Sequence, residues 1–127
     1  MPPQVEISVT PAYVRAKMAG IANNEEALEA WAQILGVCAE NNLARILAEI
    51  DIQEERPISE YFRFGERLSA FDWPRGAKVA VVCAPSTKAA CLFTENVLVN
   101  RRALETGVFD EVAAAELWLA GGRTTTG

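Results

Sequence analysis

The stretch AKVAVVCA, residues 77–84, decides the fold, because it is apolar throughout except for Lys78. A continuous apolar run of this length is typical of a strand that is covered on both faces, as the strands of parallel sheets are. The segment RILAEIDI, residues 45–52, predicts another strand upstream, and GVF, residues 107–109, predicts a short last strand. Helical patterns separate these strands, so we expect parallel pairing through right-handed crossovers.

The N-terminal residues predict an antiparallel hairpin. Residues 5–9 and 13–19 alternate apolar and polar side chains, which is the period of a half-buried strand. Thr10-Pro11 lies between the two segments and favours a tight turn. The first strand is therefore expected to run antiparallel to the second.

Four helices are predicted. Asn23 precedes Glu26 by three residues, which is typical of a helix start, and the apolar stripe that follows ends near residue 42. Ser59 is expected to cap the second helix, and a third is expected to follow Pro85. Asp110 is expected to cap the last helix. The apolar stripe of the first helix consists of Leu28, Trp31, Leu35 and Cys38, and that of the second of Tyr61, Phe64, Gly65, Leu68 and Phe71.

The predicted order is β-β-α-β-α-β-α-β-α, an α/β fold with a mostly parallel sheet and an antiparallel first strand. No repeat or linker divides the chain, so residues 1–120 form a single domain in this prediction. Residues 121–127 are rich in glycine and threonine and are expected to form a flexible C-terminal tail.

The composition excludes several classes of function. The chain has no histidine, which rules out histidine-activated nucleophiles and histidine-ligated zinc. Its net charge is −5, with 12 basic and 17 acidic residues, which disfavours nucleic-acid binding. No apolar run approaches the ~20 residues of a membrane helix, and the N-terminus resembles no export signal, so we expect a cytoplasmic protein. Cys38, Cys83 and Cys91 form no C-x-x-C pair and are expected to fill the core as free thiols.

Four segments together resemble the SpoIIAA-like proteins, which belong to the STAS-like group of bacterial cytoplasmic domains. They are residues 44–51, PISEYFRFGE at 57–66, FTENVLVNR at 93–101, and the ending that combines VFD at 108–110 with ELWL at 116–119. The resemblance spans essentially the whole chain and implies a sheet wound through four successive β-α turns.

The resemblance also implies a way of working. The anti-sigma-factor antagonists of this family bind a kinase partner and are switched by phosphorylation of a serine that follows an aspartate after the third strand. If Glu49 matches the family's strand-end acid, Ile58 takes the place of that serine; if Asp51 matches it, Glu60 does. Neither register supplies the serine, so the resemblance implies the fold more directly than the switch.

Two serines and a group of carboxylates are further candidates. Ser59, and Ser86 in the sequence Ser86-Thr87-Lys88, stand at expected helix starts, where each either binds or carries a phosphate or simply caps its helix. Glu49 and Asp51 share one face of a strand end, with Glu54 and Glu55 behind them. They form either a metal or acid–base cluster or a solvated strand end.

Half of the ten aromatic residues lie in or just after the second helix, namely Tyr61, Phe62, Phe64, Phe71 and Trp73. Phe62 lies off the apolar stripe, which suggests an exposed aromatic surface for a protein partner or a second copy. Packing of these rings into the core is the alternative. We therefore expect a non-enzymatic, cofactor-free domain that acts by protein–protein interaction, either with a protein partner or as a homodimer. The alternative is a domain that binds a small, apolar, lipid-like ligand.

Overall fold

The computed structural model describes residues 4–20, 23–51, 58–83 and 105–121. Within these residues the chain forms one five-stranded sheet of order β1-β2-β3-β4-β5. The strands are β1 (Gln4–Val9), β2 (Val14–Ala19), β3 (Arg45–Asp51), β4 (Lys78–Cys83) and β5 (Glu105–Phe109). Strand β1 is antiparallel to β2 and all other neighbours are parallel, which confirms the predicted α/β class and the antiparallel first strand.

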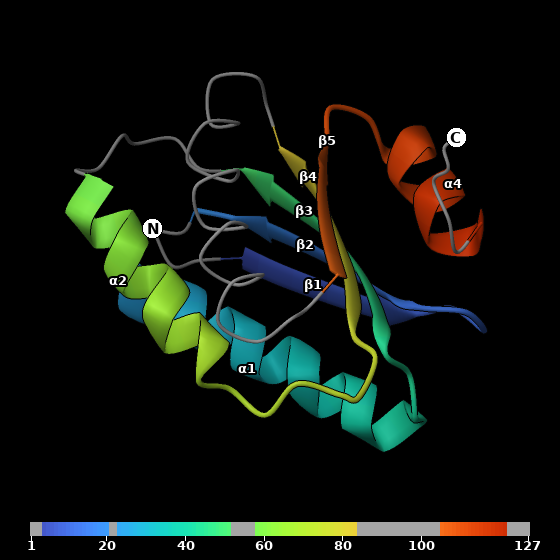
Figure 1. The fold of residues 1–127 in the computed structure, drawn as a ribbon, viewed down its shortest axis with the longest axis horizontal. Coiled ribbons are helices and arrows are strands. Elements are labelled where there is room, and N and C mark those ends of the chain that lie inside the picture. Colours follow the sequence, from blue (N-terminus) through green and yellow to red (C-terminus); the bar gives the residue numbers. More distant parts are fainter. Residues whose placement is uncertain (1–3, 21–22, 52–57, 84–104, 122–127) are drawn as a thin grey trace.

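Three helices are described: α1 (Asn24–Asn41), α2 (Ile58–Ser69) and α4 (Val112–Gly121). The helix expected after Pro85 falls in residues 84–104, outside the described part, as do Ser86 and Cys91. Figure 1 shows α1 and α2 on one face of the sheet and α4 on the other. Right-handed crossovers that add each new strand on the same side put α1 and α2 on the same face. Helix α4 follows the last strand, so it is free to cover the opposite face.

The two faces of the sheet bury two separate clusters because side chains alternate along each strand. Toward α1 and α2 the strands contribute the buried residues Val14, Ala16, Met18, Ile46, Ala48 and Val79. Toward α4 they contribute Leu47 and Ala80, which pack with Ala115 and Leu119 of the helix. Strand β4 is thus covered on both faces, as its apolar sequence predicted.

Helix α1 begins and ends where its sequence predicts. The side chain of Asn23 accepts a hydrogen bond from the backbone N–H of Glu26 at 2.9 Å, which satisfies one of the free donors of the first turn. At the other end Asn42 adopts a left-handed conformation with φ of 54°, which asparagine tolerates better than most residues. Trp31 is buried, and its ring lies 5.9 Å from that of Trp73.

Lys78 is the polar exception in β4, and it holds α4 in place. The residue is only 5% exposed, and its ammonium donates a hydrogen bond to the carbonyl of Trp118 at 2.9 Å. That carbonyl lies in the last turn of α4, where carbonyls lack partners within the helix and a cation is favourable. The same ammonium lies 4.4 Å from the centroid of the Trp118 ring, within the range of a cation–π contact.

Both faces of the sheet should contribute to one cooperative unfolding transition. Ile34 lies on the buried side of α1 and Leu119 on the buried side of α4. We expect Ile34→Ala and Leu119→Ala each to lower the free energy of unfolding by about 2–5 kcal/mol, because each leaves a cavity in a packed cluster. Gln33→Ala, at the exposed neighbour of Ile34, should change it by less than about 0.5 kcal/mol. Urea denaturation followed by circular dichroism measures all three. A second transition in the Leu119→Ala variant would show that α4 unfolds separately from the sheet.

Candidate functional site

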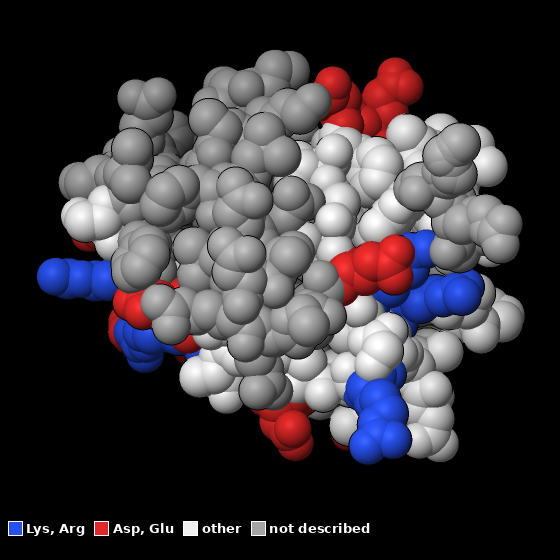
Figure 2. Space-filling view, viewed as in Figure 1, with Lys and Arg blue, Asp and Glu red and all other residues white. Residues whose placement is uncertain are grey.

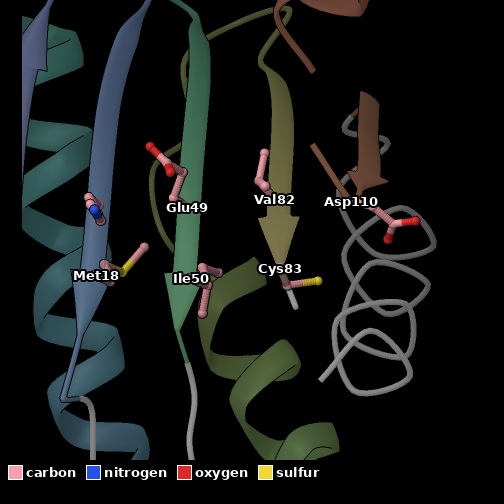
Figure 3. Close-up of a pocket in the computed structure, with 7 residues that line it drawn as sticks. Met18, Glu49, Ile50, Val82, Cys83 and Asp110 are labelled. Atoms are coloured by element: carbon pink, nitrogen blue, oxygen red, sulfur yellow. The ribbon is translucent and has the colours of Figure 1, made fainter. Parts of the chain in front are cut away.

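A pocket of about 230 Å³ lies where the parallel strands end. It is lined by Lys17 and Met18 of β2, Glu49 and Ile50 of β3, Val82 and Cys83 of β4, and Asp110 just after β5. Figure 3 shows the labelled residues of β2, β3 and β4 at the ends of these neighbouring strands, with Asp110 beside them. The carboxyl ends of parallel strands are where open α/β sheets bind their ligands, so the place of this pocket in the fold makes it the candidate site.

One ion pair organises the charges beside the pocket. The guanidinium of Arg15 donates two hydrogen bonds to the same oxygen of Glu49, from Nη2 at 2.9 Å and from Nε at 3.3 Å. Glu49 raises the pKa of Arg15, chiefly through these bonds. Arg15 and Glu49 come from neighbouring strands, and both side chains are partly exposed. The pair fixes the Glu49 carboxylate at the wall of the pocket.

Tyr13 connects this face of the sheet to α4. Its hydroxyl donates a hydrogen bond of 2.7 Å to a carboxylate oxygen of Glu116. That bond, followed by burial and by the negative charge of Glu116, raises the pKa of Tyr13 above its usual value of 10.0. Glu116 is the sole charged residue within α4. Because its carboxylate accepts the bond from Tyr13, it lies at the edge of the helix and not on its outer face.

The outer face of α4 is apolar, a feature that the sequence analysis missed. Ala113, Ala114 and Ala120 are exposed, and Leu117 is 75% exposed. A helix on a protein surface normally carries polar residues on its outer side. The signal was present in the sequence, since residues 112–121 contain a single charged residue.

The aromatic residues predicted for an interface divide between the core and the undescribed part. Trp73 is 8% exposed and donates from its indole nitrogen to the carbonyl of Leu68 at 3.0 Å. Phe64 and Phe71 are half-buried and pack against the same cluster. These three residues therefore pack into the core, which was the alternative to an exposed aromatic surface. The side chains of Tyr61 and Phe62 lie outside the described residues.

The serines and carboxylates that the sequence predicts for a site lie apart from the pocket or outside the described residues, except for Glu49. Helix α2 begins at Ile58, so Ser59 is an exposed residue of the first turn rather than the residue that precedes the helix. Of the carboxylates, Glu49 lines the pocket, whereas Glu54 and Glu55 fall outside the described residues together with Ser86. Across the described ranges, no three histidine, cysteine or acidic side chains gather to hold a metal ion.

Cys38 is buried within α1, as predicted for a thiol that fills the core. Burial raises its pKa to about 11, so the reactive thiolate is scarce at neutral pH. On the surface shown in Figure 2, acidic and basic side chains of the described residues adjoin at the left and right of the view, while the acidic ones at the top and bottom have no basic neighbour. Of the described helices, none is long and apolar enough to cross a membrane.

No family model matches the chain, and no curated protein and no solved structure matches it either. The site must therefore be interpreted from its own chemistry.

The Tyr13–Glu116 bond predicts a loss of stability at alkaline pH. Because the pKa of Tyr13 is raised in the folded chain, its contribution is complete below the ordinary tyrosine pKa and is lost as the pH rises through the folded value. We expect Tyr13→Phe to cost about 1 kcal/mol at neutral pH, since the bond is partly exposed, and this difference should shrink above pH ~10.

Ultraviolet titration of tyrosinate can assign the shift, because the chain has two tyrosines, Tyr13 and Tyr61. The ionisation that is lost in the Tyr13→Phe variant belongs to Tyr13 and should lie above the usual tyrosine pKa. A wild-type chain whose stability advantage over the variant stays constant through pH 11 would contradict the assignment.

Proposed function

We propose that this chain is a non-enzymatic, STAS-like domain of the bacterial cytoplasm that works by protein–protein interaction, and that a second copy docks on the outer face of α4. The observation that carries the proposal is that α4 is apolar on both sides. Its inner side packs on the sheet through Ala115 and Leu119, and its outer side exposes Leu117. The five-stranded sheet with its antiparallel first strand supports the STAS-like assignment at the level of fold.

The outer face of α4 carries no charged side chain that would favour its exposure to water. It is made of Ala113, Ala114, Leu117 and Ala120. The carboxylate of Glu116 is held by Tyr13, so it does not interrupt this face. An apolar helix surface without charges is typical of the centre of an interface, where charged residues are depleted.

The same face is complementary to itself. Leu117 projects between Ala113, one turn before it, and Ala120, nearly one turn after it. When two copies of α4 cross around a two-fold axis near Leu117, each leucine packs against the small residues of the other helix. The face carries no charge that would oppose this pairing.

The contact should be weak and strengthened by salt. A helix of ten residues is about 15 Å long, so it buries less than the ~800 Å² per partner of a standard interface. Two copies, each with a charge of −5, also repel one another at long range. Added salt screens that repulsion and leaves the apolar contact intact, so association should increase with ionic strength.

Sedimentation equilibrium over a series of protein concentrations tests the proposal. The average mass of the wild type should rise with concentration, and Leu117→Asp should stay monomeric, because the substitution buries an unpaired charge in the contact. Gln33→Asp is the matched control, since it adds the same charge at an exposed position of α1 and should associate as the wild type does. A wild type that is monomeric at every concentration would overturn self-association. A Leu117→Asp variant that associates normally would exclude the α4 face.

The second candidate is a domain that binds a small apolar ligand, and the pocket at the strand ends is the observation that favours it. Four of its lining residues are apolar or nearly so, namely Met18, Ile50, Val82 and Cys83. Native mass spectrometry of the purified chain separates the candidates, because it records both the number of subunits and any retained small molecule.

A further inference from the structure

We propose that the pocket at the carboxyl ends of β2, β3 and β4 binds a small zwitterion, namely an α-amino acid with an apolar side chain. The inference goes beyond self-association through α4 and does not depend on it, because no residue of α4 lines the pocket.

The charges at the pocket favour a ligand that carries both signs. Lys17 and Glu49 are direct neighbours across β2 and β3, so their backbones lie about 5 Å apart. On its other side, Lys17 faces Glu6 of β1 in the register. A purely anionic ligand at Lys17 would meet these carboxylates, and a purely cationic ligand at Glu49 would meet Lys17 and Arg15. A head group with a carboxylate and an ammonium satisfies both kinds of neighbour.

Lys17 is available to such a ligand. Although Glu49 is its neighbour in the register, Glu49 directs one oxygen to both donors of Arg15 instead. Among the described residues, the ion pairs are Arg15 with Glu49 and Arg67 with Glu25, so Lys17 belongs to neither. Its side chain is exposed and lines the pocket. The ammonium can therefore receive a carboxylate without breaking an existing pair.

The apolar part of the pocket lies beside this charged pair. Val82 of β4 is the register neighbour of Glu49, so Lys17, Glu49 and Val82 follow one another across three strands. Figure 3 shows Ile50 and Cys83 next to Glu49 and Val82 at the ends of β3 and β4. An amino acid whose head group lies at Lys17 and Glu49 can thus place its side chain over Val82, which points to the same face of the sheet.

The size of the pocket sets the class of ligand. Its volume of about 230 Å³ is below the ~300–1,000 Å³ typical of pockets for drug-sized ligands. A single amino acid fits this volume, whereas a nucleotide or a lipid chain would extend beyond it. The amino-acid proposal therefore accounts for both the size and the mixed lining, whereas a lipid-like ligand accounts for the apolar lining alone.

Titration of the isotope-labelled full chain with L-leucine, followed by amide chemical shifts, tests the proposal. Two analogues separate the charges: isocaproate lacks the ammonium and isoamylamine lacks the carboxylate. Leucine at up to about 10 mM should shift the amides of Lys17, Glu49 and Val82, with a Kd of about 1 mM or lower. Each analogue should bind at least about tenfold more weakly. No shift with leucine, or equal binding of either analogue, would overturn the proposal.

Substitution at Lys17 tests the placement of the head group. Lys17→Met keeps most of the apolar stem of an exposed side chain, so the fold should persist, and leucine binding should weaken at least about tenfold. Arg63→Met, which removes an exposed cation from α2, is the matched control and should bind leucine as the wild type does. Equal weakening in both variants would show an effect of net charge and overturn the site. The same titration in the Leu117→Asp variant should be unchanged, which separates this test from that of the α4 contact.

Discussion

The bond between Lys78 and Trp118 connects the central layer of this protein to its outer helix. Helix α4 buries Lys78 at the start of β4, and without the Trp118 carbonyl the ammonium would be an unpaired buried charge, which is costly. The carbonyl of Trp118 would in turn be a free acceptor at the end of a helix. Each group satisfies the other, so the bond both fixes α4 on the sheet and allows a lysine in a strand that is buried on both faces.

The position of α4 then determines which surface the molecule offers to others. With its inner side on the sheet and Glu116 directed to Tyr13, the helix exposes Leu117 and three alanines to the outside. The charged residues of the described surface lie on other elements, among them the Arg67–Glu25 pair that joins α2 to α1. An interaction through α4 therefore follows from the way the helix is docked and from where its single charge is directed.

Local sequence patterns could predict the helices and strands. How these pack together depends on contacts between residues that are distant in the sequence. The alternation in residues 13–19, the Asn23 cap and the apolar run around Val79 each correspond to an element of the structure. The sequence also placed Glu49 at a strand end. It could not show that Glu49 pairs with Arg15, because that pair depends on the register between β2 and β3. The partner of Lys78 lies forty residues away on α4, which no local pattern reveals.

One face of β2 connects α4 to the pocket. Side chains alternate along a strand, so Tyr13 at its start, Arg15 and Lys17 all point to the face that α4 partly covers. Tyr13 holds Glu116 of α4, Arg15 holds Glu49, and Lys17 lines the pocket. The bond that docks α4 and the pocket thus lie at opposite ends of one row of side chains. Because Arg15 occupies Glu49 from within that row, Lys17 is left as the cation that faces the pocket, and a ligand's carboxylate can reach it without disturbing the docking of α4.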